Sequence, residues 1–130
     1  MKQHQGFNLI EMVIVVAILA ILVTLAVPSY QNWVRKANRG EAQALLLNWA
    51  NNQEIWRNNN VAYAGQGDIT PPTHERYDFA VEATTNGFTL RAVARALGGQ
   101  DQDKERGTPC NILTLDQVGG KGDNAVCWQE

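Results

Sequence analysis

The chain opens with an apolar segment that holds a single charged side chain. In GFNLIEMVIVVAILAILVTLAVPSY, residues 6–30, that charge is Glu11, and the next charged residue is Arg35. As a helix, residues 7–27 would span about 31 Å, close to the roughly 30 Å of a bilayer's hydrocarbon core. The pattern therefore predicts a membrane-spanning helix that carries a carboxylate near its start.

A helical pattern of apolar positions continues after Pro28 and ends near Arg57, where three asparagines follow. It contains an early stripe, formed by Tyr30, Trp33, Val34 and Ala37, and a later stripe, formed by Ala42, Leu45, Leu46, Trp49 and Trp56. We interpret the later stripe as the face packed on the rest of the chain and the early one as available to other chains. A single continuous core face is the alternative. Because Pro28 lacks an amide donor, we expect a kink or local unwinding there.

Beyond the helix the pattern changes to alternation. NNNVAYAGQGDITPPTHE, residues 58–75, predicts a loop because it is rich in Gly, Pro and Asn. YDFAVEA and GFTLRAVARA alternate apolar and polar positions and predict two strands joined by a hairpin turn at TTNG. A further strand is predicted at NILTL and a short one around AVCW. The predicted fold class is α+β, with a small antiparallel sheet on the back of a long helix.

Composition limits the function. The chain has 130 residues and a formal net charge of -2, so it lacks the basic character typical of nucleic-acid binders. These features favour a small membrane-tethered domain. Lys2 and His4 precede the apolar segment and indicate that the N-terminal end stays cytoplasmic. Arg35, Lys36 and Arg39 argue weakly for the opposite orientation, but we expect them on one solvated helix face.

Cys110 and Cys127 are the two cysteines of the chain. Two cysteines that bracket a loop in an exported domain most often form a disulfide, which would contribute about 3 kcal/mol through loop closure. Two free thiols in a cytosolic protein are the alternative, which the apolar N-terminal segment disfavours.

A cleavable signal peptide has a shorter apolar core, and a plain signal anchor leaves Glu11 unexplained. The segment instead resembles the N-terminus of type IV pilins and their pseudopilin relatives. The shared features are a short basic leader that ends in Gly6, Phe7 as the first mature residue, an acid at the fifth mature position, a long aliphatic run and Pro28 followed by SYQNWVRKA. Asn8 departs from the Thr that is common in the family.

The resemblance implies a role for each of these residues. Prepilin peptidase would cut after Gly6 and methylate the new amine of Phe7. Glu11 would pair with the Phe7 amine of a neighbouring subunit, because an acid in lipid without a partner is unfavourable. The domains implied are a leader at residues 1–6, a transmembrane and assembly helix at residues 7–28, which includes Pro28, and a periplasmic or extracellular head at residues 29–130.

A second resemblance covers the tail. TPCNILTLDQVGGKGDNAVCW is similar to the disulfide-bounded region of type IVa pilins, closest to small PilE-type minor pilins. It favours a pilin over a major pseudopilin of type II secretion. It also supports a disulfide between Cys110 and Cys127.

The sequence contains no complete catalytic, phosphate-binding or calcium-binding motif. His74 stands alone in a predicted exposed loop, and the sequence around Lys121 lacks the residues of a phosphate-binding loop. Asp101, Asp103 and Glu105 alternate as in a calcium loop but lack its Gly and closing Glu. We expect no enzyme, cofactor or metal site; a weak calcium site of a type other than an EF-hand is the alternative to a solvated loop at these acids.

DNA binding, known among related minor pilins, would require a basic stripe near the disulfide. Between the cysteines Lys121 stands against Asp116 and Asp123. Four further basic residues could converge on it in the fold: Arg91, Arg95, Lys104 and Arg106. The local charge balance disfavours DNA without excluding it.

The expected function is that of a structural, minor subunit of a type IV pilus. The expected partners are other pilins, prepilin peptidase, the inner-membrane assembly machinery and, before assembly, membrane lipid. We expect a single-pass inner-membrane protein with its head in the periplasm, which then enters an extracellular fibre that supports adhesion, twitching motility or DNA uptake. A major pilin, a type II secretion pseudopilin and a DNA-binding uptake pilin are the alternatives.

Overall fold

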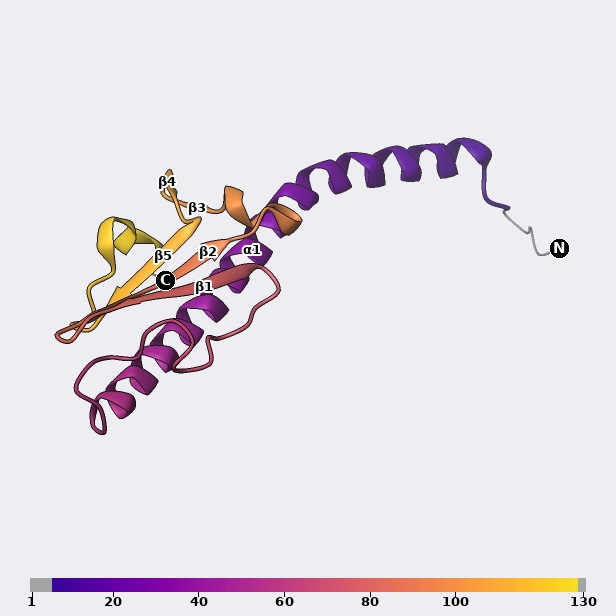
Figure 1. The fold of residues 1–130 in the computed structure, drawn as a ribbon. Coiled ribbons are helices and arrows are strands. Elements are labelled where there is room, and N and C mark those ends of the chain that lie inside the picture. Colours follow the sequence, from indigo (N-terminus) through magenta and orange to yellow (C-terminus); the bar gives the residue numbers. More distant parts are fainter. Residues whose placement is uncertain (1–5, 129–130) are drawn as a thin grey trace. The chain divides into compact units, whose positions relative to one another are not determined.

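The computed structural model describes residues 6–128. The chain forms two compact units, the first ending at Val34 and the second beginning at Arg35. The second unit contains all strands of the described chain (Figure 1). Lys2 and His4, on which the predicted orientation depends, lie outside the described residues.

Helix α1 spans Leu9–Arg57 and ends at the predicted residue. It includes Pro28 without a break in the helical assignment, so the local unwinding suggested by the sequence is absent from this state. Proline removes one amide donor, and the turns on either side of Pro28 keep the backbone helical. Tyr30 and Trp33 of the early stripe are both 67% exposed.

A three-stranded antiparallel sheet forms the centre of the second unit. Its strands are β1 (Tyr77–Ala83), β2 (Phe88–Ala94) and β5 (Ile112–Asp116), in the order β1-β2-β5. The predicted alternation is confirmed, because Tyr77, Leu90 and Leu113 are buried while their neighbours along the strands are more exposed. At the predicted hairpin turn the amide of Thr84 donates to the carbonyl of Gly87 at 2.8 Å.

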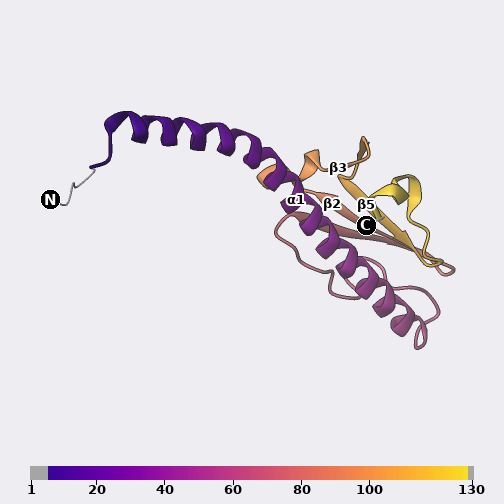
Figure 2. The ribbon, with the colours of Figure 1, turned by 180° about the vertical axis from the view of Figure 1, so that it is seen from behind.

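Within the second unit, α1 covers one face of this sheet (Figures 1 and 2). Ala42, Leu46 and Trp49 of the later stripe are buried in one core cluster with residues from the inner faces of all three strands. The same stripe also buries Arg39 and Gln53, which the apolar pattern did not include. The stripe is therefore continuous at helical spacing, with a polar residue at each end.

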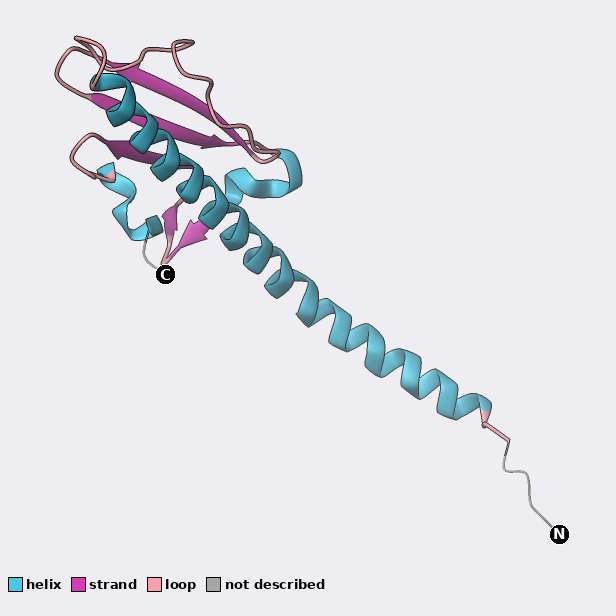
Figure 3. Cartoon of the chain, turned by 90° about the horizontal axis from the view of Figure 1, so that it is seen from below, coloured by secondary structure: helices cyan, strands magenta, loops and turns pink. Residues whose placement is uncertain are grey.

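Short elements complete the second unit (Figure 3). They are the 3₁₀ helix η1 (Leu97–Gln102), the two-residue strands β3 (Lys104–Glu105) and β4 (Thr108–Pro109), and the 3₁₀ helix η2 (Gly122–Trp128). The strand predicted at AVCW is wrong, since these residues belong to η2. Gly98 adopts a positive φ of 66°, and a Cβ there would lie 1.7 Å from Arg76 Nη1, so this turn requires glycine.

Candidate assembly site and disulfide region

The start of the chain presents the three residues that the prepilin resemblance singled out. Gly6 and Phe7 precede α1, and Phe7 is 79% exposed. The carbonyl of Asn8 accepts hydrogen bonds from the amides of Glu11 and Met12 at 3.0 and 3.3 Å, so Asn8 opens the helix. Asn and Thr are both favoured at helix N-termini, which explains why Asn is compatible with this position.

Glu11 lies in the first turn of α1 and is exposed. A carboxylate at this end is favoured by the partial positive charge of the helix N-terminus. The structure gives Glu11 no ion pair with any residue between 6 and 128. Among the described residues, no cation therefore competes for this carboxylate.

The aliphatic segment that follows has no cover within the fold. Among residues 6–128, α1 is the helix long and apolar enough to cross a membrane, and none of its most apolar 18-residue window is buried. The one hydroxyl inside this segment, on Thr24, donates to the carbonyl of Ile21 at 2.7 Å. The segment thus exposes almost only hydrocarbon, and an apolar environment must come from lipid or from other helices.

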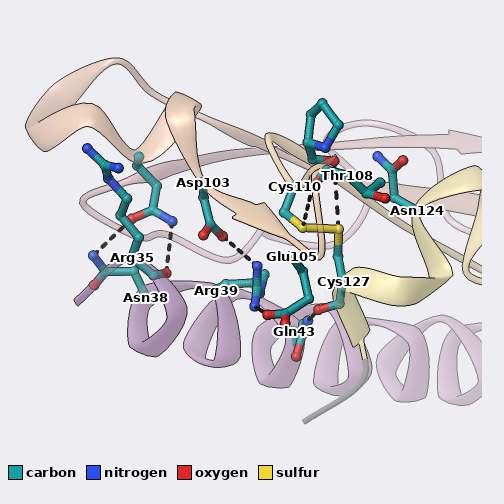
Figure 4. Close-up of polar contacts among 12 residues, drawn as sticks. Arg35, Asn38, Arg39, Gln43, Asp103, Glu105, Thr108, Cys110, Asn124 and Cys127 are labelled. Carbon is teal, nitrogen blue, oxygen red and sulfur yellow. Dashed lines mark hydrogen bonds and ion pairs between the residues drawn. A yellow bond between two sulfur atoms is a disulfide. The ribbon is translucent and has the colours of Figure 1, made fainter. Parts of the chain in front are cut away.

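Cys110 and Cys127 form a disulfide with an S–S distance of 2.03 Å, as predicted. Both residues are buried in the core cluster. Gln43 of α1 donates from Nε2 to the carbonyl of Cys127 at 2.7 Å, which ties η2 to the helix (Figure 4). The disulfide region is therefore held both by a covalent bond and by a hydrogen bond to α1.

A second link between α1 and this part of the chain centres on Arg39 (Figure 4). Its side chain, 3% exposed, donates to Asp103 at 2.9 Å and to Glu105 at 2.5 Å. The hydrogen bond from Arg39 lowers the pKa of Glu105. Burial raises the pKa of Asp103 and outweighs the attraction of the same guanidinium. The prediction that Arg39 lies on a solvated face is wrong, because Asp103 at the end of η1 and Glu105 of β3 both pair with its buried side chain.

Gln100 extends this polar cluster. Its Nε2 donates to the carbonyl of Arg35 at 3.0 Å and to the hydroxyl of Tyr77 at 2.9 Å, while its Oε1 accepts from Asn38 at 3.1 Å. Burial raises the pKa of Tyr77 to about 12. The network joins α1, β1 and η1, and it fixes the segment that leads into the disulfide region.

The other residues considered for chemistry have structural roles. His74 is not the exposed loop residue that we expected, since its side chain is only 10% exposed. Its Nδ1 accepts from the amide of Arg76, so Nε2 carries the proton and donates to Glu41 at 3.0 Å. Asp103 and Glu105 of the alternating acids bind Arg39, and residues 6–128 contain no group of three or more His, Cys, Asp or Glu placed to hold a metal ion.

The basic residues considered for DNA mostly have local partners. On the outer face of the hairpin, Arg91 pairs with Glu82 at 3.7 Å and Arg95 pairs with Asp78. The hydrogen bond from Arg95 lowers the pKa of Asp78. Lys121 lies 5.3 Å from the ring centre of Trp128. Carboxylates therefore partly neutralise Arg91 and Arg95, and Lys121 is placed beside an aromatic ring.

Comparison with known families gives two matches that together cover most of the chain. Residues 1–27 match the prokaryotic N-terminal methylation motif. Residues 28–114 match the family described as type IV minor pilin ComP, DNA uptake sequence receptor.

Similar proteins include both pilins and fimbrial subunits. The chain is 29% identical to fimbrial protein EcpC of Eikenella corrodens, over 99% of this chain and 84% of that protein. It is 27% identical to type IV major pilin protein PilE1 of Neisseria gonorrhoeae, over 78% of this chain and 64% of the relative. The fold is similar to that of a type IV pilin from Shewanella oneidensis, with a TM-score of 0.57, 25% identity, and coverage of 74% of this chain and 99% of that one.

Proposed function

The chain belongs to the type IV pilins, in the family described as type IV minor pilin ComP, DNA uptake sequence receptor, and on this premise we propose that it is a minor structural subunit of a type IV pilus. Its N-terminal helix first spans the inner membrane, with the head in the periplasm, and then enters the core of the fibre. It has no enzymatic activity.

One observation carries this proposal: the aliphatic segment of α1 has no buried residue in its most apolar window, while Glu11 beside it has no ion pair within residues 6–128. An exposed apolar surface of this size requires lipid or other helices. A carboxylate at its edge requires a positive partner in either environment. The helix of a neighbouring subunit would supply the apolar environment, and its free N-terminal amine would supply the positive partner of Glu11.

Processing by prepilin peptidase creates that amine. Cleavage after Gly6 leaves Phe7 at the N-terminus, and the match to the methylation motif supports methylation of its nitrogen. A Cβ on Gly6 would meet nothing within 4 Å, and Phe7 is exposed, so the bond between them is accessible in the described chain. A methylated amine stays positively charged and can pair with Glu11 of the next subunit.

Pro28 is proposed to act during the transfer from membrane to fibre. Here α1 is helical through Pro28, but the missing amide donor makes this the weakest turn of the helix. Unwinding there would let the two parts of the helix pack independently in the fibre. A high-resolution fibre structure in which the helix stays continuous through Pro28 would contradict this role.

The minor role is tested by peptide mass spectrometry on sheared surface fibres, with this chain quantified against every other pilin. A scarce chain that begins with methylated Phe7 is the expected result. A dominant chain would make it the major subunit, as in the relative PilE1, and absence from fibres would favour a pseudopilin.

DNA binding is a second candidate function, because the matching family is described as a DNA uptake sequence receptor. The paired arginines on the hairpin do not exclude it. Arg91 and Arg95 are about half exposed, and exposed ion pairs contribute only about 0–1 kcal/mol, so a phosphate can replace the carboxylate partner. Lys121 adds a positive charge beside the disulfide region.

Fluorescence anisotropy with labelled duplex DNA at several salt concentrations tests this second function. A DNA receptor binds one sequence more tightly than shuffled controls, and its affinity falls with salt in proportion to the phosphates contacted. Arg91→Ala should then reduce the salt dependence, while Glu75→Ala serves as a control that removes an exposed acid. Equal, weak binding to all sequences would leave only the structural role.

A further inference from the structure

Tyr30 and Trp33 are the two large aromatic side chains of the first unit that follow the aliphatic segment. They lie three residues apart on α1 and therefore share one helix face. Both are 67% exposed. Of the chain's four tryptophans, Trp33 is the one that is exposed, whereas Trp49 is 2% exposed in the core and the other two are half-buried.

Their distance from the aliphatic segment matches the thickness of a headgroup layer. If the apolar core ends at Val27, the Cα atoms of Tyr30 and Trp33 lie about 4.5 and about 9 Å beyond it along the helix axis. The headgroup layer on each side of a bilayer is about 5–8 Å thick. Side chains on a helix also tilt toward its N-terminus, which here is the direction of the membrane. Both rings therefore reach back into the interfacial layer.

The chemistry of this stretch also fits an interface. No charged residue occurs between Glu11 and Arg35. The polar residues between and beside the two rings, Ser29, Gln31 and Asn32, are uncharged and exposed. Tyr and Trp combine an apolar ring with one hydrogen-bonding group, which is why they concentrate where hydrocarbon meets water.

We propose that Tyr30 and Trp33 form an interfacial anchor that binds the lipid headgroup layer on the head side of the membrane and sets the depth of the helix before assembly. This inference rests on the proposed membrane-spanning state. It identifies a lipid contact for two exposed aromatic side chains of the first unit. Release of the two rings from that layer is then part of extracting the subunit into a fibre.

Depth-dependent fluorescence quenching tests the anchor. The full chain is reconstituted in phosphatidylcholine–phosphatidylglycerol vesicles at high lipid excess, with lipids brominated either near the glycerol or deep in the acyl chain. The signal of Trp33 is the difference between the wild type and Trp33→Phe, which keeps an aromatic ring. Trp56→Phe is the matched control, because Trp56 lies in the second unit and its removal should leave the lipid-quenchable signal unchanged.

The inference predicts that shallow bromines quench Trp33 more strongly than deep bromines, and that Tyr30→Ala changes this ratio. Absence of quenching by either lipid, or stronger quenching by the deep one, would overturn it. Flotation of the same vesicles in a density gradient tests the underlying membrane state separately. Chain that floats without shallow quenching contradicts only the anchor, while chain that stays at the bottom contradicts the membrane-spanning state.

Discussion

Arg39 links α1 to the segment that leads into the C-terminal disulfide region. A buried guanidinium is tolerated only when its charge and its donors are satisfied, and here two carboxylates share it. The sequence places Arg39 beside Arg35 and Lys36, which suggests a solvated basic face. The burial of Arg39 depends on Asp103 and Glu105, which lie 64 and 66 residues further along the chain, so the local sequence does not indicate it.

Replacing Arg39 with Ala should destabilise the head by about 3–5 kcal/mol, since Asp103 would remain buried without its partner. Urea unfolding of the full chain in detergent, followed by circular dichroism, measures this change. Lys36→Ala is the control, because Lys36 is an exposed neighbour and its loss should change stability by no more than about 0.5 kcal/mol. Equal stability of both variants would show that the Arg39 pairs contribute nothing.

The pH dependence of stability should reveal the same cluster. Because Arg39 lowers the pKa of Glu105 below 4.5, this pair stabilises the head above pH 4.5 and loses its contribution as the pH falls through the lowered value. Burial raises the pKa of Asp103, so Asp103 has the opposite effect. Its ionisation disfavours folding once the pH rises above the pKa that Asp103 has in the unfolded chain.

Glu105→Gln should therefore flatten the loss of stability in acid. Urea midpoints between about pH 7 and about pH 3 measure it, with the wild type as reference. A variant that loses as much stability as the wild type over this range would contradict the assignment to Glu105.

At the scale of elements, the disulfide closes the loop between β4 and the end of η2. Replacing both cysteines by Ser should cost about 3 kcal/mol by the loop-closure relation. Thermal unfolding of the full chain in detergent measures the loss, and flotation with vesicles should be unchanged because the apolar segment of α1 belongs to the first unit and the disulfide to the second. An unchanged melting temperature would show that other contacts, such as Gln43 to Cys127, suffice.

The helix, β1, β2 and β5 were predictable because each depends on a pattern within its own segment. The end of α1 at Arg57 and the alternation of β1 are examples. The strand predicted at AVCW failed, since those residues coil into η2, where the disulfide and the bond from Gln43 hold Cys127. The two-residue strands β3 and β4 are too short to leave a periodic signal, and their position depends on pairing with each other and on the ion pair between Glu105 and Arg39.

The candidate sites also differ in whether a local sequence pattern reveals them. The prepilin motif is local and singled out Gly6, Phe7 and Glu11, whose roles stay predictions. The pairing of Cys110 with Cys127, which followed from their number, is confirmed. The buried pair of Arg39 with Asp103 joins residues 64 positions apart, so no local pattern reports it. An isolated Arg within an otherwise apolar helical stripe was the one available signal.

At the scale of the whole molecule, the proposed function places one aliphatic surface in two environments. Lipid tails are as apolar as the side chains of another helix, so moving the segment from membrane to fibre gains little hydrophobic free energy. The proposed ion pair between Glu11 and the N-terminal amine of a neighbouring subunit would supply both affinity and register in that exchange. For this reason we propose that a single carboxylate directs assembly.

The most direct test is the incorporation of Glu11→Gln into surface fibres, with Glu75→Gln as a control that neutralises an exposed acid of the head. The variant keeps the shape of the side chain but cannot form an ion pair. We predict normal membrane insertion and cleavage after Gly6, and a fall in fibre content of at least about tenfold, which corresponds to about 1.4 kcal/mol. Fibre content of Glu11→Gln equal to that of the wild type and of Glu75→Gln would contradict the account.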